Sequence, residues 1–179
     1  MKDKEIEIKF EITASQKEKI LADLKNVAVK VGDSHLVDTY YIPNFKSFME
    51  NGETIESVRI RESHKGSIIN YKKIHKEATP VYCDEFETKV EDKDQMEKLL
   101  LAIGFEVEMV IDKTRETYIY KNFEIDFDFI KNLGLLMEVE IKDPNASIED
   151  IYDFVSKYGL GVKDKRGGIQ NLMRDKLGR

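Results

Sequence analysis

The chain has 179 residues, of which 41% are hydrophobic and 36% charged, and its formal net charge is −6. This acidic balance argues against general nucleic-acid or anionic-membrane binding, which depends on a basic surface. One cysteine excludes an intramolecular disulfide and a cysteine-rich zinc site. The chain has no run of about 18 apolar residues and starts with charged residues. We therefore expect one soluble, cytoplasmic domain over residues 1–179.

The N-terminal half alternates between polar and apolar residues, a pattern that predicts strands with two unlike faces. It predicts strands over residues 4–12, 27–31, 35–42, 55–61, 68–74 and 81–90. A helix is expected up to about residue 26, with Ser15 as its N-cap and Glu18 as the capping-box partner. A helical turn is expected over 45–50, and a second helix over 92–103, which ends at Gly104.

The C-terminal half continues the same pattern. One or two strands are predicted over 105–120, then strands over 123–129 and 136–141 on either side of a turn at 132–134. Ser147 is expected to cap a helix that extends to about residue 158, and a last helix is predicted over 169–177. Strands of this number without intervening long helices predict an antiparallel α+β fold.

Six of the predicted strands carry two charges of the same sign, two residues apart. Residues two apart in a strand point to the same face, roughly 6.6 Å from each other along the chain. Like charges held this way repel, so their repetition needs an explanation. The pairs are Glu5/Glu7, Arg59/Arg61, Glu85/Glu87, Lys113/Arg115, Asp126/Asp128 and Glu138/Glu140.

A sheet that closes on itself, with its apolar face under helices and its charged face inside, would explain these pairs. Inward basic pairs suit a polyanion such as a triphosphate, and inward acidic pairs suit hard divalent cations. The pattern therefore predicts a closed antiparallel β-barrel with helices outside and metal-assisted phosphoryl or nucleotidyl chemistry inside. The alternative is that the pairs belong to ordinary solvated strand faces.

The same residues resemble the motifs of the CYTH superfamily, which contains class IV adenylate cyclases and thiamine triphosphatases. Glu5-Ile6-Glu7-Ile8-Lys9 is similar to its N-terminal E-x-E-x-K signature. Further similar elements follow in the superfamily's order along nearly the whole chain. They are Asp38-Thr39-Tyr40, Arg59-Ile60-Arg61, Asn70-Tyr71-Lys72-Lys73, Glu85-Phe86-Glu87, Lys113-Thr114-Arg115, Asp126 and Gly134 to Glu138-Val139-Glu140.

The resemblance implies an eight-stranded antiparallel tunnel that binds a triphosphate compound with Mg²⁺ or Mn²⁺. Lys9 and Tyr40 are the catalytic candidates; Tyr40 is either a packing residue or, at the tunnel mouth, orients a nucleophile with its hydroxyl. The triphosphate would be held by Lys9, Arg59, Arg61, Lys72, Lys113 and Arg115. The metal ligands would be Glu5, Glu7 and Glu140, with Glu87, Asp126 and Glu138 in support.

Two reactions fit such a site. The chain looks most like class IV adenylate cyclases, which convert ATP to cyclic AMP and pyrophosphate. The first alternative is hydrolysis of inorganic tripolyphosphate, thiamine triphosphate or a nucleoside triphosphate, and the second is a non-catalytic polyphosphate or nucleotide binder. The expected partner is a small triphosphate molecule, neither nucleic acid nor membrane, and a homodimer is left open. Lys163, Lys165 and Arg166 form either a solvated basic turn or a cap over the phosphate end.

Overall fold

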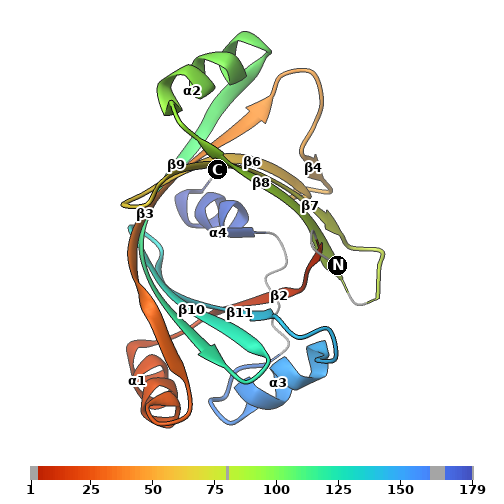
Figure 1. Ribbon diagram of the computed structural model, residues 1–179. Helices are drawn as coiled ribbons and strands as arrows, with labels where there is room; N and C mark the ends of the chain where they lie inside the picture. Colours follow the sequence, from red (N-terminus) through yellow and green to blue (C-terminus); the bar gives the residue numbers. More distant parts are fainter. Residues whose placement is uncertain (1–3, 80, 162–167, 179) are drawn as a thin grey trace. The chain divides into compact units, whose positions relative to one another are not determined.

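The computed structural model describes residues 4–79, 81–161 and 168–178 (Figure 1). The basic segment with Lys163, Lys165 and Arg166 lies outside these residues. The elements are β1 (Lys4–Glu5), β2 (Glu7–Glu11), α1 (Ala14–Leu24), β3 (Val29–Pro43), β4 (Met49–Glu50), β5 (Glu53–Thr54), β6 (Glu56–Ser63), β7 (Gly66–His75), β8 (Tyr82–Val90), α2 (Lys93–Ala102), β9 (Phe105–Tyr120), β10 (Phe123–Ile130), β11 (Gly134–Ile141), α3 (Ile148–Ser156) and α4 (Gly168–Leu177).

One sheet contains nine of the described strands, in the order β1-β8-β7-β6-β3-β9-β10-β11-β2. The first and last strands of this order, β1 and β2, are consecutive in the chain and are separated only by Ile6. This strand order is that of an antiparallel barrel. The predicted fold class is therefore confirmed. The expected strand number was eight, and the ninth arises because the predicted strand over 4–12 is interrupted at Ile6 and pairs at both edges of the sheet.

The chain divides into two compact units, and β3 and β9 are divided between them. We call residues 1–4, 35–113 and 167–179 the first unit, and residues 5–34 and 114–166 the second unit. None of the helices in the described parts of the chain has the length and apolar character needed to cross a bilayer.

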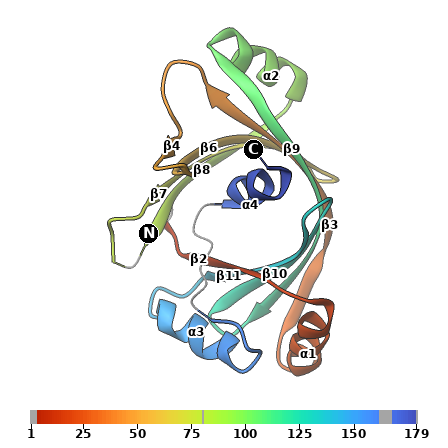
Figure 2. The same cartoon turned by 180° about the vertical axis from the view of Figure 1, so that it is seen from behind.

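The second unit packs two helices against three strands. In Figures 1 and 2, α1 and α3 lie on the same side of β2, β10 and β11. Because successive residues of a strand point to opposite faces, alternate residues face the helices and are almost fully buried. Most of their neighbours in sequence are charged and face the other way. The core includes Ile8, Phe10, Ile125, Phe127, Met137 and Val139 from the strands, and Ile20, Leu24, Ile151 and Val155 from the helices.

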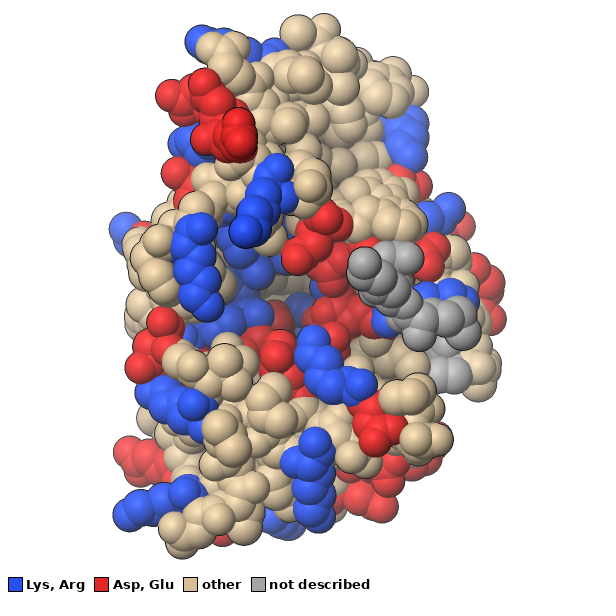
Figure 3. Space-filling model, viewed as in Figure 1, with Lys and Arg blue, Asp and Glu red and all other residues tan. Residues whose placement is uncertain are grey.

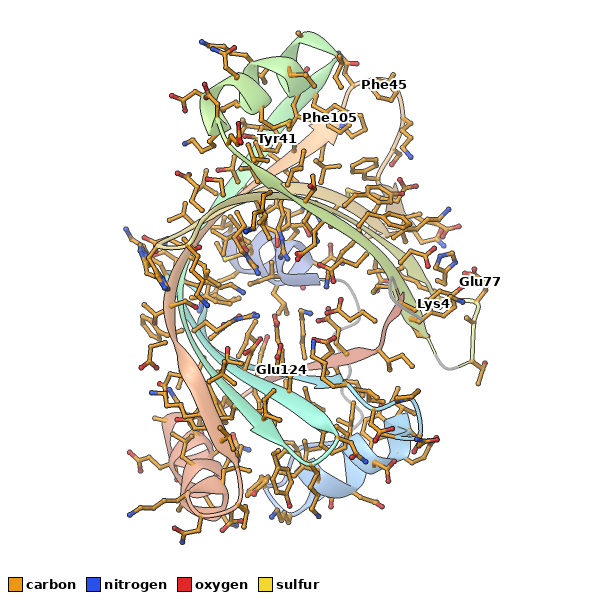
Figure 4. The ribbon with its side chains drawn as sticks, viewed as in Figure 1. Lys4, Tyr41, Phe45, Glu77, Phe105 and Glu124 are labelled. Carbon is orange, nitrogen blue, oxygen red and sulfur yellow. The ribbon has the colours of Figure 1, made fainter. Side chains whose placement is uncertain are left out.

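The first unit has its own, smaller core. β6 lies between β3 and β7, and β8 follows β7, all antiparallel. Tyr41, Val58 and Ile60 bury the apolar face of these strands against Leu100 of α2. Phe45 and Phe105 meet edge to face at 5.8 Å, in the part of the unit that also holds Tyr41 and α2 (Figure 4). The apolar face expected under helices is thus present in both units.

The predicted start of the first helix was wrong. Thr13, not Ser15, is the N-cap of α1, and Gln16 rather than Glu18 completes the capping box. Thr13 has an extended backbone, and its hydroxyl accepts a hydrogen bond from the Gln16 amide. Ser15 already lies inside the helix, where its side chain cannot reach the free amides of the first turn. By contrast, the cap predicted at Ser147 is confirmed, and the helix expected from residue 92 forms with Asp92 as its N-cap.

Two further predictions were wrong in the same region. The separate strands over 27–31 and 35–42 are one strand, β3, which continues through Gly32 because pairing with neighbours overrides the turn preference of Gly and Asp. The helical turn over 45–50 does not form. Instead β4 pairs with β5 across Asn51 and Gly52, which both have positive φ, and Asn-Gly is the preferred pair for such a hairpin turn.

Candidate active site

The polar face of the first unit is built from β3, β6, β7 and β8. Asp38 is directly opposite Arg61, and Tyr40 is directly opposite Arg59. On the other side of β6, Arg59 faces Asn70, and Asn70 faces Glu87. The next row pairs Lys72 with Glu85. Strand alternation therefore brings five of the predicted site residues onto one face, namely Tyr40, Arg59, Arg61, Lys72 and Glu87.

Asp38 is the central anion of this face. Its side chain is completely buried, and it accepts two hydrogen bonds from Arg61, at 2.6 Å from Nε and 2.7 Å from Nη2. Arg59 Nη1 lies 3.6 Å from the second carboxylate oxygen. Burial alone would raise the pKa of Asp38, but Arg59, Arg61 and Lys113 reverse this and lower it well below its usual value. Asp38 therefore stays ionised and fixes the surrounding cations.

Glu85 is the second anion of the face. It lies 3.2 Å from Lys72 and 3.8 Å from Arg59, and it accepts a hydrogen bond from the Asn70 amide. Arg59 also donates to the Tyr40 hydroxyl at 3.4 Å. Burial, the largest influence, raises the pKa of Tyr40, so its hydroxyl keeps its proton.

The first unit therefore holds a cluster of cations that already have internal carboxylate partners. Arg59, Arg61 and Lys72 converge on Asp38 and Glu85, and Lys113, which is 3% exposed, is close enough to lower the pKa of Asp38. We call these four cations the basic cluster. Guanidinium and ammonium groups held in fixed positions are suited to binding the oxygens of a phosphate chain. An anionic ligand would compete with Asp38 and Glu85 for them.

The polar face of the second unit is dominated by carboxylates, arranged in rows across β10, β11 and β2. In one row Glu124 is opposite Glu140, which is opposite Glu7. In the next row Asp126 is opposite Glu138, which is opposite Lys9. We call the first row the carboxylate row. Directly opposite like charges destabilise a sheet unless something neutralises them.

Arg115 neutralises much of the second row. It donates from Nε and Nη2 to Asp128, both at 2.6 Å, and from Nη2 to Glu138, also at 2.6 Å, and it pairs with Asp126 as well. Thr117 donates a further hydrogen bond to Asp126 at 2.6 Å. Burial nevertheless raises the pKa of Asp126 to about 6. Arg115, predicted to bind phosphate, is thus tied to three carboxylates in this structure.

The carboxylate row is less completely neutralised. Burial and the nearby charge of Glu5 raise the pKa of Glu140 to about 8, although Lys142 lies 2.6 Å away and acts in the opposite direction. Glu7 raises it further, while Glu7 itself pairs with Lys9. Lys9 also lies 3.6 Å from Glu138. Burial and the neighbouring carboxylates thus outweigh the effect of Lys142 on Glu140 and favour its protonated form.

A divalent cation fits this donor set. Mg²⁺ and Mn²⁺ prefer carboxylate oxygens, and Glu5, Glu7 and Glu140 supply them close enough for Glu5 and Glu7 to raise the pKa of Glu140. Within residues 4–79, 81–161 and 168–178, no three His, Cys, Asp or Glu side chains are already arranged around a metal position. The physical reason is visible in the contacts, because Lys9, Lys142 and Arg115 are interleaved with the carboxylates.

Every predicted site residue falls in one of the two units, with most of the predicted cations in the first and most of the predicted metal ligands in the second. The first unit holds Tyr40, Arg59, Arg61, Lys72, Glu87 and Lys113, and the second holds Glu5, Glu7, Lys9, Arg115, Asp126, Glu138 and Glu140. Among the predicted metal ligands, Glu87 is the one found in the first unit, opposite Asn70.

The prediction missed residues that act as partners of the cations. Asp38 was noted only as part of a motif, although it is the most buried acid of the first unit. Asp128 belonged to one of the six charge pairs but received no role, and it is completely buried against Arg115. Period-two spacing from Tyr40 and Asp126 could have found both. Asn70 and Glu85 needed the strand register, which the sequence does not show.

One face of the molecule carries charges of both signs. On the face shown in Figure 3, Lys and Arg side chains are interspersed with Asp and Glu side chains, and no broad area of one sign is present.

Comparison with known proteins agrees with this description. The family model described as CYTH domain matches residues 3–166. A candidate adenylate cyclase of Methanocaldococcus jannaschii is 29% identical over 147 residues, which cover 82% of this chain and 79% of that protein. Several solved structures share the fold. The PH1819 protein of Pyrococcus horikoshii has a TM-score of 0.76 and 21% identity, and covers 96% of this chain and 99% of its own.

Another solved structure is similar over nearly its whole length. It is a candidate adenylyl cyclase of Hippeastrum with a TM-score of 0.63 and 12% identity, covering 99% of this chain and 96% of its own. At these identities the two structures bear on the fold alone. The family model, in contrast, spans most of the chain and includes every element that carries the charged rows. The chain belongs to the CYTH domain family.

Proposed function

We propose that this chain is a metal-dependent enzyme that acts on a triphosphate, with cyclisation of ATP to cyclic AMP and pyrophosphate as the leading reaction. The observation that carries the proposal is the grouping of charge. The first unit holds the basic cluster around buried Asp38, and the second holds the carboxylate row with a raised pKa at Glu140. A metal–triphosphate complex needs both kinds of group, whereas simple anion binding gains nothing from the carboxylates.

In this proposal the basic cluster binds the phosphate oxygens and offsets their charge. Arg59 and Arg61 can each present two N–H groups to one phosphate, and Asp38 holds Arg61 in a fixed orientation before substrate arrives. Preorganised cations of this kind stabilise the negative charge that develops as the phosphorus–oxygen bond breaks. Lys9 is the corresponding cation in the second unit, beside Glu7 and Glu138.

The carboxylates Glu5, Glu7 and Glu140 would hold Mg²⁺ or Mn²⁺, with Asp126, Glu138 and Glu87 as supporting ligands. When bound, such a cation neutralises phosphate charge and lowers the pKa of an attacking oxygen. Tyr40 keeps its proton, so its hydroxyl can donate a hydrogen bond that positions the nucleophile but does not serve as a base.

Hydrolysis of tripolyphosphate, thiamine triphosphate or a nucleoside triphosphate is the second candidate. It uses the same cations and differs in the nucleophile, which is water instead of the ribose 3′-hydroxyl. The fold is compatible with this reaction, because the Hippeastrum adenylyl cyclase candidate that shares it is described as having a dominant triphosphatase activity. The similarly named M. jannaschii relative favours the cyclase. A non-catalytic binder, a homodimer and a cytoplasmic location remain further predictions.

Incubation with each triphosphate distinguishes the reactions. The purified chain is incubated with ATP, thiamine triphosphate or tripolyphosphate and Mg²⁺ or Mn²⁺. Cyclic AMP together with pyrophosphate identifies the cyclase, and orthophosphate identifies the hydrolase. If neither forms although tripolyphosphate binds, the chain is a binder and the enzymatic proposal is wrong.

Substitution of the carboxylates tests the metal role. Glu7→Ala and Glu140→Ala should abolish turnover while tripolyphosphate binding partly survives, because the basic cluster is intact. Glu149→Ala, in the exposed first turn of α3, removes the same charge outside the site and should leave turnover unchanged. Unchanged metal-dependent turnover in both site variants would contradict the assignment.

A further inference from the structure

The carboxylate row of the second unit places three acids directly across neighbouring strands. Glu124 of β10 faces Glu140 of β11, and Glu140 faces Glu7 of β2. Directly opposite side chains in an antiparallel sheet have Cβ atoms roughly 5 Å apart. The ionised row is therefore strained by repulsion unless a cation lies among its oxygens.

Lys142 supplies such a cation from the same face. It follows Glu140 by two residues, so it points to the same side of β11 as Glu140 does. Its ammonium nitrogen lies 2.6 Å from Glu140 Oε2 and 3.6 Å from Glu124 Oε1. The ammonium group thus sits between two carboxylates that belong to different strands. Glu124, one of this pair, lies on the second unit in Figure 4.

An open hollow lies next to this ammonium group. Its volume is about 360 Å³, and it is lined by Lys121, Asn122, Lys142, Asp143, Pro144 and Asn145. The Lys142 backbone is held in place, because its amide donates to the Asn122 carbonyl at 2.8 Å. The Lys142 side chain is 45% exposed. The ammonium group can therefore turn from the carboxylates into the hollow without any movement of the strand.

We propose that the Lys142 ammonium occupies, in the metal-free chain, the position between Glu140 and Glu124 that the divalent cation takes. Lys142 is then a tethered competitor of the cation, and Glu124 is a further carboxylate of the cation site. Binding of the cation displaces Lys142 into the adjacent hollow. This inference rests on the proposed function, because it assumes that Glu140 is a metal ligand.

Net charge determines whether Lys142 or a divalent cation binds more strongly to Glu140 and Glu124. Two carboxylates and one ammonium leave a net charge of −1, whereas two carboxylates and one divalent cation are neutral. A divalent cation therefore interacts more favourably with the two carboxylates than the Lys142 ammonium does. Because the ammonium must be displaced, the measured metal affinity reflects only the difference between the two interaction free energies. The tethered ammonium would offset part of the negative charge of the row, so that the chain can fold before metal is available. The same contact would weaken metal binding.

Replacement of Lys142 tests the competition. Titration of Mn²⁺ alone into the full chain, followed by calorimetry, should give a dissociation constant roughly tenfold lower for Lys142→Met than for wild type. The matched control is Lys121→Met, which removes the same charge from the same hollow. Lys121 lies over the Tyr120 ring, so its loss should not change Mn²⁺ affinity. Glu124→Gln should weaken Mn²⁺ binding, and Glu149→Gln should not.

The outcomes separate this inference from the proposed function. Equal or weaker Mn²⁺ binding by Lys142→Met would overturn the competition and leave the metal site standing. Absence of Mn²⁺ binding in wild type and variant alike would overturn both. If Lys142→Met does not fold, wild-type protein with ¹³C-dimethylated lysines answers the same question. The Lys142 resonance, assigned with Lys142→Arg, should shift when Mg²⁺ is added, and an unchanged resonance would contradict displacement.

Discussion

Asp38 and Arg61 face each other across β3 and β6 and are joined by two parallel hydrogen bonds of 2.6 and 2.7 Å. The same carboxylate lies 3.6 Å from Arg59. A single buried acid thus holds two cations of the basic cluster in place. The consequence is that this cluster is organised before any phosphate arrives, and that ligand binding replaces an internal anion with an external one.

Asp38→Asn should destabilise the protein. The substitution keeps the shape of the side chain but leaves Arg59 and Arg61 without their buried counter-charge, which costs about 3 kcal/mol in comparable pairs. Urea denaturation should show this loss. The same variant should bind tripolyphosphate more tightly than wild type, because the phosphate no longer competes with a carboxylate.

Asp112→Asn is the matched control for this prediction. Asp112 pairs with His35 at 2.7 Å in the same unit, but its side chain is 43% exposed. Exposed pairs contribute about 0–1 kcal/mol, so the urea midpoint should hardly change. Equal effects of the two substitutions would show that Asp38 has no special role.

Arg59→Ala should weaken phosphate binding. Loss of one charge-assisted contact corresponds to about 1.5–3 kcal/mol, or more than a tenfold rise in the dissociation constant. Calorimetry with tripolyphosphate in the absence of metal measures this directly. Lys65→Ala removes a charge from the exposed turn between β6 and β7 and serves as the control. A dissociation constant that does not change in Arg59→Ala would remove Arg59 from the binding cluster.

The metal-free protein should lose stability as pH rises. Glu140 has a pKa of about 8 in the folded chain and 4.5 as its ordinary value. The folded state therefore keeps a proton that the unfolded state releases, so the free energy of unfolding falls between about pH 4.5 and pH 8. Urea midpoints in EDTA at pH 5 and pH 8.5 should differ accordingly.

Two comparisons isolate the contribution of Glu140. Glu140→Gln cannot ionise, so its midpoint should fall less between the two pH values than that of wild type. Mg²⁺ should restore the wild-type midpoint at pH 8.5, because it binds the ionised carboxylates. A wild type and a Glu140→Gln variant with the same pH dependence would contradict the raised pKa.

Thr13→Ala should destabilise α1. Thr13 is the observed N-cap, and loss of such a side chain costs about 1 kcal/mol. Ser15→Ala, at the position that the local pattern favours, should cost much less because Ser15 is inside the helix. The two urea denaturation curves decide between the two caps, and a larger effect at Ser15 would contradict the observed start of the helix.

Local patterns predicted most of the fold. Period-two alternation located the strands because the two faces of each strand meet different surroundings, as Phe127 and Asp128 illustrate. The same alternation selected Arg59, Arg61, Glu138 and Glu140 for the site. It failed where pairing decided the outcome: β3 continues through Gly32, and Asn51-Gly52 closes a hairpin instead of following a helical turn. At Gly32 pairing with neighbouring strands overrides a local preference, whereas at Asn51-Gly52 the local turn signal outweighs the helical pattern.

The sequence by itself determined which side chains share a face, because backbone geometry alone imposes a period of two on a strand. Only the tertiary structure decided which charges are partners. That Asp38 binds Arg61, that Arg115 joins Asp126, Asp128 and Glu138, and that Lys142 reaches Glu124 depend on strand register. Register is set by the packing of whole strands and helices, so no local run of residues contains it.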